Sequence, residues 1–143
     1  MSEFLLPIMQ EIDFPSQAEN IHLVEKLIDD VCEELKVNED HYGNILIALT
    51  EAVNNAIHHG NALDPSKKTF VSCGRLDNTL KFVVKDEGTG FDFDNLPDPT
   101  DPENIEKPNG RGIFLMKNLA DEISFEDDGR IVELTFQLEM SVN

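Results

Sequence analysis

The apolar residues in the first part of the chain recur at intervals of three and four, which is the spacing of an amphipathic helix. This spacing predicts a helix over residues 17–36, where Ser16 and Glu19 match the S-x-x-E capping box of a helix N-terminus. It predicts a second helix that begins after Asn38, a good N-cap residue, and ends near Gly60. The inward-facing positions of these two helices are Ile21, Val24, Ile28, Val31, Leu35, Ile45, Leu49, Ala52, Val53 and Ala56.

Short runs rich in β-branched and aromatic residues predict five strands. They fall at residues 8–14, 68–76, 79–86, 122–126 and 130–138. Asp77-Asn78 suits a tight hairpin turn, and Asp127-Asp128-Gly129 suits the turn of a second hairpin. A third helix is expected from Gly110 to about Ala120, with Ile113, Met116 and Leu119 facing inward. The order β-α-α-β-β-α-β-β predicts an α+β two-layer sandwich, with three helices on one face of a mixed, mainly antiparallel sheet.

Length and composition narrow the class of protein. The 143 residues are enough for one domain, which we expect to span residues 1–143. With 29 acidic against 11 basic residues the formal charge is −18, which disfavours direct binding to nucleic acid or to an anionic membrane. The two cysteines form no CxxC motif, and no apolar run is long enough for a signal peptide or a membrane span, so we expect a cytoplasmic protein.

The second helix carries a polar stripe beside its apolar one. Glu51, Asn55 and His59 are four residues apart and therefore lie on one side of the helix. An asparagine carbonyl oxygen suits Mg²⁺, and a glutamate one turn earlier can take a proton from a hydroxyl or a water. The alternative is an ordinary solvated face. Adjacent His58 and His59 point about 100° apart, so they are not expected to share one metal ion.

A second cluster, Asp86-x-Gly88-x-Gly90, follows a strand rich in valine and phenylalanine. A half-buried carboxylate in this position needs donors to offset its desolvation, and the exocyclic amine of adenine is such a donor. The two glycines allow a flat ring to approach the backbone closely. An acidic capping residue or a calcium loop is the alternative interpretation.

The third cluster, Gly110-Arg111-Gly112, stands at the start of the third helix, after the long polar segment 92–109. The free N–H groups of such a helix start bind phosphate oxygens without a lysine. No Walker lysine motif is present, so a P-loop is excluded. A structureless segment of this length in a small domain is typical of a functional lid or a disordered insert.

Taken in order, the three clusters resemble the N box (residues 51–56) and the two glycine boxes (86–91 and 110–116) of the gyrase/chaperone/histidine-kinase/MutL, or GHKL, ATPase superfamily. Within it, the chain resembles the stand-alone anti-sigma-factor serine/threonine kinases of bacterial stress and sporulation switches. The resemblance covers nearly the whole chain. It implies the Bergerat fold, with residues 92–109 as the ATP lid.

The resemblance also implies roles for single residues and for the protein as a whole. It implies Glu51 as general base, Asn55 as Mg²⁺ ligand, Asp86 on the adenine amine, Gly88 and Gly90 along the base, and Gly110 and Gly112 on the phosphates. It implies transfer of the γ-phosphoryl group of ATP to a serine or threonine of a small anti-sigma-factor antagonist protein. The same subunit, often a homodimer, is expected to sequester a sigma factor in the other state.

The chain departs from this family pattern in three places. Lys107-Pro108-Asn109 replaces an arginine expected before the second glycine box, for which Lys107 or Arg111 is the substitute. Gly129-Arg130 replaces a Gly-Thr pair whose threonine helps to hold the base. Six acidic residues between 92 and 106 make the lid segment strongly negative.

These departures leave other functions open beside the kinase. One is an ATP-sensing module that binds a partner with little phosphotransfer, and another is a slow ATP hydrolase. A histidine autokinase is disfavoured, because we expect no two-helix segment ahead of the domain that would present a phospho-accepting histidine.

Overall fold

Five strands form one sheet, in the order β1-β2-β3-β5-β4, in the computed structural model, which describes residues 7–88 and 108–138. The strands are β1 (Ile8–Pro15), β2 (Lys68–Leu76), β3 (Thr79–Lys85), β4 (Glu122–Glu126) and β5 (Ile131–Gln137). Every neighbouring pair is antiparallel, so the sheet is antiparallel throughout rather than mixed. β3 is the central strand and pairs with β5, and these two strands carry Phe82 and Phe136, whose rings pack edge to face at 6.1 Å.

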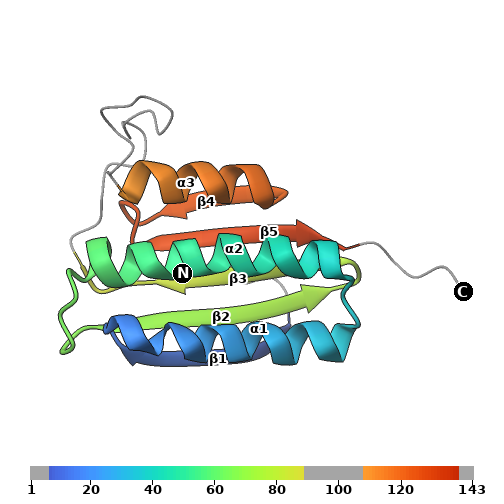
Figure 1. Ribbon diagram of the computed structural model, residues 1–143, viewed down its shortest axis with the longest axis horizontal. Helices are drawn as coiled ribbons and strands as arrows, with labels where there is room; N and C mark the ends of the chain where they lie inside the picture. The colour runs from blue at the N-terminus through green and yellow to red at the C-terminus, as the bar shows by residue number, and fades with distance from the viewer. Residues whose placement is uncertain (1–6, 89–107, 139–143) are drawn as a thin grey trace, which may run out of the picture.

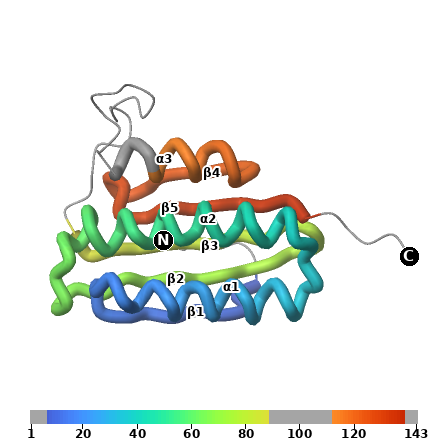
Figure 2. The backbone as a smooth tube through the Cα atoms, viewed as in Figure 1, coloured from blue at the N-terminus to red at the C-terminus, as the bar shows by residue number. Residues whose placement is uncertain are grey.

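The α-helices of the described residues all cover one face of this sheet (Figure 1). They are α1 (Ile21–Leu35), α2 (Glu39–Asn55) and α3 (Pro108–Leu119). A short 3₁₀ turn, η1 (Ala18–Asn20), precedes α1, and a single π turn, η2 (Ala56–Gly60), extends α2. The backbone trace shows α2 running between α1 and α3 over the middle of the sheet (Figure 2). The predicted two-layer α+β sandwich is therefore confirmed.

The core lies between the helices and the sheet, at positions that the apolar spacing predicts. Val24, Ile28 and Val31 of α1 are fully buried, as are Ile45 and Leu49 of α2. Burying a side chain of this size stabilises the fold by roughly 1.5–3 kcal/mol. The core therefore holds α2, which carries the predicted Glu51–Asn55 stripe, firmly on the sheet.

Local capping signals were predicted with mixed success. Asn38 caps α2 as expected, because its Oδ1 accepts the His41 N–H at 2.8 Å. The predicted capping box at Ser16 and Glu19 is wrong. Ser16 is buried, and its hydroxyl lies 2.9 Å from Thr69 Oγ1 on β2. The first helical turn is the 3₁₀ turn η1, which has no side-chain cap.

The third helix begins at Pro108, two residues before the predicted start, so residues 108 and 109 belong to α3 and not to a lid. Proline suits this place because it has no N–H to leave unpaired and its φ is already helical. The remainder of the predicted lid, which includes Lys107, lies outside the described residues, and so does Gly90 of the first glycine box. Over the ranges that the structure describes, no helix is both long and apolar enough to cross a membrane.

Candidate functional site

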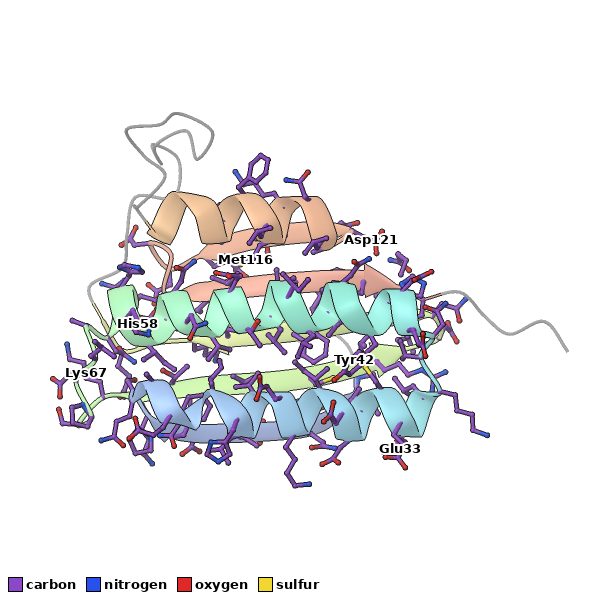
Figure 3. All side chains as sticks on the ribbon, viewed as in Figure 1. Glu33, Tyr42, His58, Lys67, Met116 and Asp121 are labelled. Atoms are coloured by element: carbon purple, nitrogen blue, oxygen red, sulfur yellow. The ribbon has the colours of Figure 1, made fainter. Side chains whose placement is uncertain are left out.

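The polar stripe of α2 lines an open pocket of about 330 Å³. Its lining consists of Glu51, Asn54, Asn55, His58 and His59. This end of α2, marked by His58, lies beside the start of α3 (Figure 3). Burial and, to a smaller extent, the adjacent His58 lower the pKa of His59, which favours the neutral form of its ring. The residues that the spacing placed on one stripe therefore do face one pocket.

The helix ends in a π turn just beyond this stripe. The Asn61 N–H donates to the Ala56 carbonyl oxygen, five residues back, at 2.8 Å, and the Leu63 N–H donates to the Ile57 carbonyl oxygen at 2.8 Å. Such wide turns recur at functional sites because they redirect the chain without breaking the helix. Here the turn brings Gly60 and Asn61 against the end of β3.

Asn61 joins the end of α2 to the first glycine turn, a role that the sequence analysis missed. Its side chain is fully buried. Its Nδ2 donates to Ser16 Oγ at 2.7 Å and to the Lys68 carbonyl oxygen at 2.9 Å. Its Oδ1 accepts the Glu87 N–H at 2.8 Å, and Glu87 Oε1 in turn accepts the Lys68 N–H at 2.6 Å. A polar residue directly after Gly60 was the one sequence signal of this network.

Asp86 lies half-buried directly after β3, as the sequence predicts. Its Oδ1 accepts the Gly88 N–H at 2.9 Å, and its own N–H donates to the Arg130 carbonyl oxygen at 3.0 Å. Burial raises the pKa of Asp86, while the Gly88 N–H and the Arg130 guanidinium partly oppose that rise. A carboxylate in this setting gains from a further hydrogen-bond donor, such as the amine of adenine.

A narrow second pocket joins Asp86 to Asn55. Its lining consists of Ala52, Asn55, Ala56, Val84, Asp86, Ile113, Met116, Gly129 and Val132. The space inside is about 10 Å³, enough for about one water molecule. Met116 lies on the side of α3 that faces α2 (Figure 3). A flat base therefore does not fit into this space unless some of the lining residues move.

Gly112 brings the second glycine box against the N box. A Cβ built on Gly112 would lie 3.0 Å from Asn55 Nδ2 and 3.0 Å from Glu51 Oε2. No larger residue fits here without displacing one of these two side chains. α3 thus covers the Glu51–Asn55 stripe with bare backbone. Gly110 and Arg111 lie in the first turn of α3, and their contacts fall outside what the structure describes.

The Asn55 side chain fits the role of a ligand. Its Nδ2 is buried and has no hydrogen-bond partner among the residues that the structure describes, a costly situation that a bound group would relieve. The amide oxygen and nitrogen exchange places by a flip, so the same site can present a carbonyl oxygen to a cation. Within the described ranges no three His, Cys, Asp or Glu side chains cluster as metal ligands. The residues therefore suit Mg²⁺ held largely by phosphates and waters, with Asn55 as one protein ligand.

Comparisons with known proteins show which family and which relatives the chain resembles. The histidine kinase-like ATPase domain family matches residues 14–136. The chain is 30% identical over 132 residues to the serine-protein kinase RsbW of Bacillus cereus (strain AH820), covering 87% of this chain and 82% of that protein. The same figures hold for the serine-protein kinase RsbW of Bacillus thuringiensis (strain Al Hakam).

A solved structure has the same fold. It is the crystal structure of the RsbU and RsbW domains of Rv1364c from Mycobacterium tuberculosis, with a TM-score of 0.65 and 18% sequence identity. The match covers 91% of this chain and 33% of that longer chain.

Proposed function

The chain belongs to the histidine kinase-like ATPase domain family, and from that premise we propose that it is a Mg²⁺- and ATP-dependent serine/threonine protein kinase that also acts as an anti-sigma factor. One observation carries the proposal. Asn55 of α2 and Asp86 after β3 line one pocket, while Gly112 of α3 closes over Asn55 and Glu51. The three motifs, far apart in the sequence, thus meet at one place.

In this proposal the base end of the site lies at Asp86. Its carboxylate accepts the amine of adenine, and Gly88 and Gly90 are the residues proposed to lie along the base. Guanine presents a carbonyl oxygen at the corresponding position, which a carboxylate repels. The site should therefore prefer ATP to GTP.

The phosphate end lies between α2 and the start of α3. Asn55 is the proposed Mg²⁺ ligand, and Gly110, Arg111 and Gly112 are the proposed phosphate-binding residues. Bound Mg²⁺ would neutralise charge on the phosphates and hold them in place. The whole chain, residues 1–143, is proposed as one ATP-binding domain with residues 92–109 as its lid, shortened at its end by the two residues that α3 takes up.

Glu51 is the proposed general base. It lies on the wall of the open pocket of about 330 Å³, where a segment of another protein can approach. Its carboxylate would accept the proton of a serine or threonine hydroxyl, whose oxygen forms a bond to the γ-phosphorus of ATP. The bond from that phosphorus to the bridging oxygen breaks, and ADP leaves.

The proposed acceptor is a small anti-sigma-factor antagonist protein, and the proposed sequestered partner is a sigma factor. The relatives named serine-protein kinase RsbW support the kinase role. The formal charge of −18 favours a partner with a basic surface. A homodimer, a cytoplasmic location and the lack of a direct nucleic-acid or membrane partner belong to the same proposal.

Phosphate transfer can be tested directly. The protein is incubated with Mg²⁺, ATP labelled on its γ-phosphate and the small regulators encoded beside its gene, and phosphopeptides are mapped. We expect label on one serine or threonine of one regulator. Nucleotide binding with no labelled protein would favour the ATP-sensing module, and release of free phosphate without a labelled protein would favour the hydrolase.

A further inference from the structure

The side chain of Arg130 joins two turns that are distant in the sequence. Arg130 directly precedes β5, and its Nε donates to the Gly88 carbonyl oxygen at 2.7 Å. Its own carbonyl oxygen accepts the Asp86 N–H at 3.0 Å. One residue therefore holds both ends of the Asp86–Gly88 turn, once through its backbone and once through its guanidinium group.

The guanidinium group is itself anchored in the β4–β5 turn. Its Nη1 donates to the Asp127 carbonyl oxygen at 3.1 Å and to Asp127 Oδ1 at 3.3 Å, and it forms an ion pair with Asp128 Oδ2 at 3.6 Å. The arginine side chain is 29% exposed. A planar guanidinium fixed by several acceptors loses little further freedom when it holds Gly88.

The β4–β5 turn, to which the Arg130 guanidinium is bound, also forms part of the narrow pocket beside Asp86. Asp127, Asp128 and Gly129 all have left-handed φ angles, of 52°, 55° and 86°. Two consecutive aspartates in that conformation are strained and persist where surrounding bonds hold them. Gly129 is buried and lines the narrow pocket together with Asp86. The position of this turn therefore sets one wall of the pocket.

Several charged groups act on the Asp86 carboxyl. Arg130 and Lys67 favour its ionised form, as does the Gly88 N–H, while Asp127 and burial disfavour it. Arg130 is the cation that also contacts the Asp86–Gly88 turn directly. Its removal would therefore change both the geometry and the charge at the base end of the site.

We propose that Arg130 is a positioning residue that sets the selectivity of this site for adenine over guanine by locking the Asp86–Gly88 turn to the β4–β5 turn. The proposal rests on the proposed ATP site. The Arg130 guanidinium would not contact the base itself. It would hold the Gly88 carbonyl oxygen and so keep the Asp86 carboxylate in the position that accepts an amine donor.

Two substitutions separate the geometry from the charge. Arg130→Gln keeps hydrogen-bond donors and removes the charge, while Arg130→Lys keeps the charge and removes the planar fork. Arg75→Gln is the matched control, because Arg75 Nε makes the same kind of bond to a turn carbonyl, that of Asp77, at 2.8 Å in the β2–β3 hairpin. The measured quantities are the dissociation constants for ATP and GTP between pH 3 and pH 8.

We expect Arg130→Gln to weaken ATP binding about tenfold with little change for GTP, and to move the pH midpoint of ATP binding upward. Arg130→Lys should weaken ATP binding but keep the wild-type midpoint, and Arg75→Gln should match the wild type. The inference would be overturned if Arg130→Gln had the same ATP affinity, ATP/GTP ratio and pH midpoint as the wild type. The proposed function would remain intact in that case.

A ligand-free measurement keeps the inference separate from the ATP site. The Asp86 carboxyl is titrated by ¹³C NMR in the wild type, Arg130→Gln and Arg130→Lys. We expect a higher Asp86 pKa in Arg130→Gln than in the other two proteins. An identical titration in all three would contradict the role of Arg130 even if ATP binds. A higher Asp86 pKa in Arg130→Gln together with a wild type that binds no ATP would contradict the proposed function and leave the positioning role of Arg130 intact.

Discussion

Gly88 lies directly against the carbonyl oxygen of Gly60, and a Cβ built on Gly88 would overlap that oxygen. A Cβ on Gly60 would likewise overlap the Asp86 carboxylate. Neither Gly60 nor Gly88 therefore has room for a side chain where the first glycine turn meets the end of α2. Because a backbone carbonyl cannot swing aside as a flexible side chain can, Gly88→Ala should lower the melting temperature by roughly 5–10 °C.

Gly43 provides the matched control for this prediction. It lies in α2, and a Cβ built there meets nothing within 4 Å. Gly43→Ala should stabilise the protein by about 0.5–1 kcal/mol, because alanine loses less backbone freedom than glycine in a helix. Equal melting temperatures for Gly88→Ala and Gly43→Ala would show that the Gly60–Gly88 contact is looser than described.

Asn61 should be important for stability although it touches no proposed ligand. Asn61→Ala removes the partner of the Glu87 N–H and of the Lys68 carbonyl oxygen, leaving both groups without it in a partly buried setting. We expect a loss of roughly 2–4 kcal/mol in the free energy of unfolding, measured by urea denaturation, and faster hydrogen exchange at the Glu87 amide.

The control for Asn61 is Asn118→Ala. Asn118 Nδ2 bonds to the Phe114 carbonyl oxygen on the exposed side of α3. Its removal should change the free energy of unfolding by at most about 0.5 kcal/mol. If both substitutions lower the free energy of unfolding by the same amount, the hydrogen bonds of Asn61 stabilise the fold no more than a surface hydrogen bond does.

The features that could be predicted from the sequence are those that depend on residues close together in the chain. Asn38 caps α2 because the cap bond spans three residues, and Asp77 turns the β2–β3 hairpin with a left-handed φ of 53°. Apolar spacing placed Ile113 and Met116 on the buried side of α3. It also placed Glu51 and Asn55 on one stripe, because helical periodicity alone brings residues four apart together.

Long-range polar contacts were not predictable in the same way. Ser16 satisfied a local capping pattern, yet its hydroxyl contacts Thr69, 53 residues away. Arg130 was seen as a departure from a family pattern, but its bond to Gly88 spans 42 residues. The order of the strands in the sheet decides which distant groups lie within hydrogen-bond distance of each other. Local sequence patterns do not reveal that order.

Asp86 should show opposite effects on ATP binding and on stability. Asp86→Asn removes a charged acceptor for the adenine amine and should weaken ATP binding about ten- to hundredfold. Because burial raises its pKa in the folded state, the carboxyl binds its proton more tightly in the folded than in the unfolded chain. The stability that this group contributes is therefore present below its ordinary pKa of 3.8 and is lost as pH rises through the higher folded value.

The ligand-free Asp86→Asn protein should therefore gain stability relative to the wild type as pH rises from 3 to 7. Melting curves across this range, without nucleotide, measure the difference. A difference that is the same at every pH would mean that Asp86 is not held in a desolvated position.

Glu51 should matter for the rate of phosphate transfer and not for nucleotide affinity. Glu51→Ala should slow transfer to the acceptor protein by about 10²–10⁴-fold with a nearly unchanged dissociation constant for ATP, because a general base acts in the transition state. Glu51→Gln is the closest control, since it keeps the size of the side chain beside Gly112. An equal loss of affinity and rate would indicate a structural glutamate.

The central claim is that Asn55, Asp86 and the start of α3 form one site for ATP and Mg²⁺. Titration calorimetry with ATP and GTP, with and without Mg²⁺, tests it in the wild type and in Asn55→Ala. We expect the wild type to bind ATP in preference to GTP and more strongly with Mg²⁺, and we expect no effect of Mg²⁺ in Asn55→Ala. No heat from ATP at millimolar concentration, or equal binding of ATP and GTP by the wild type, would contradict it.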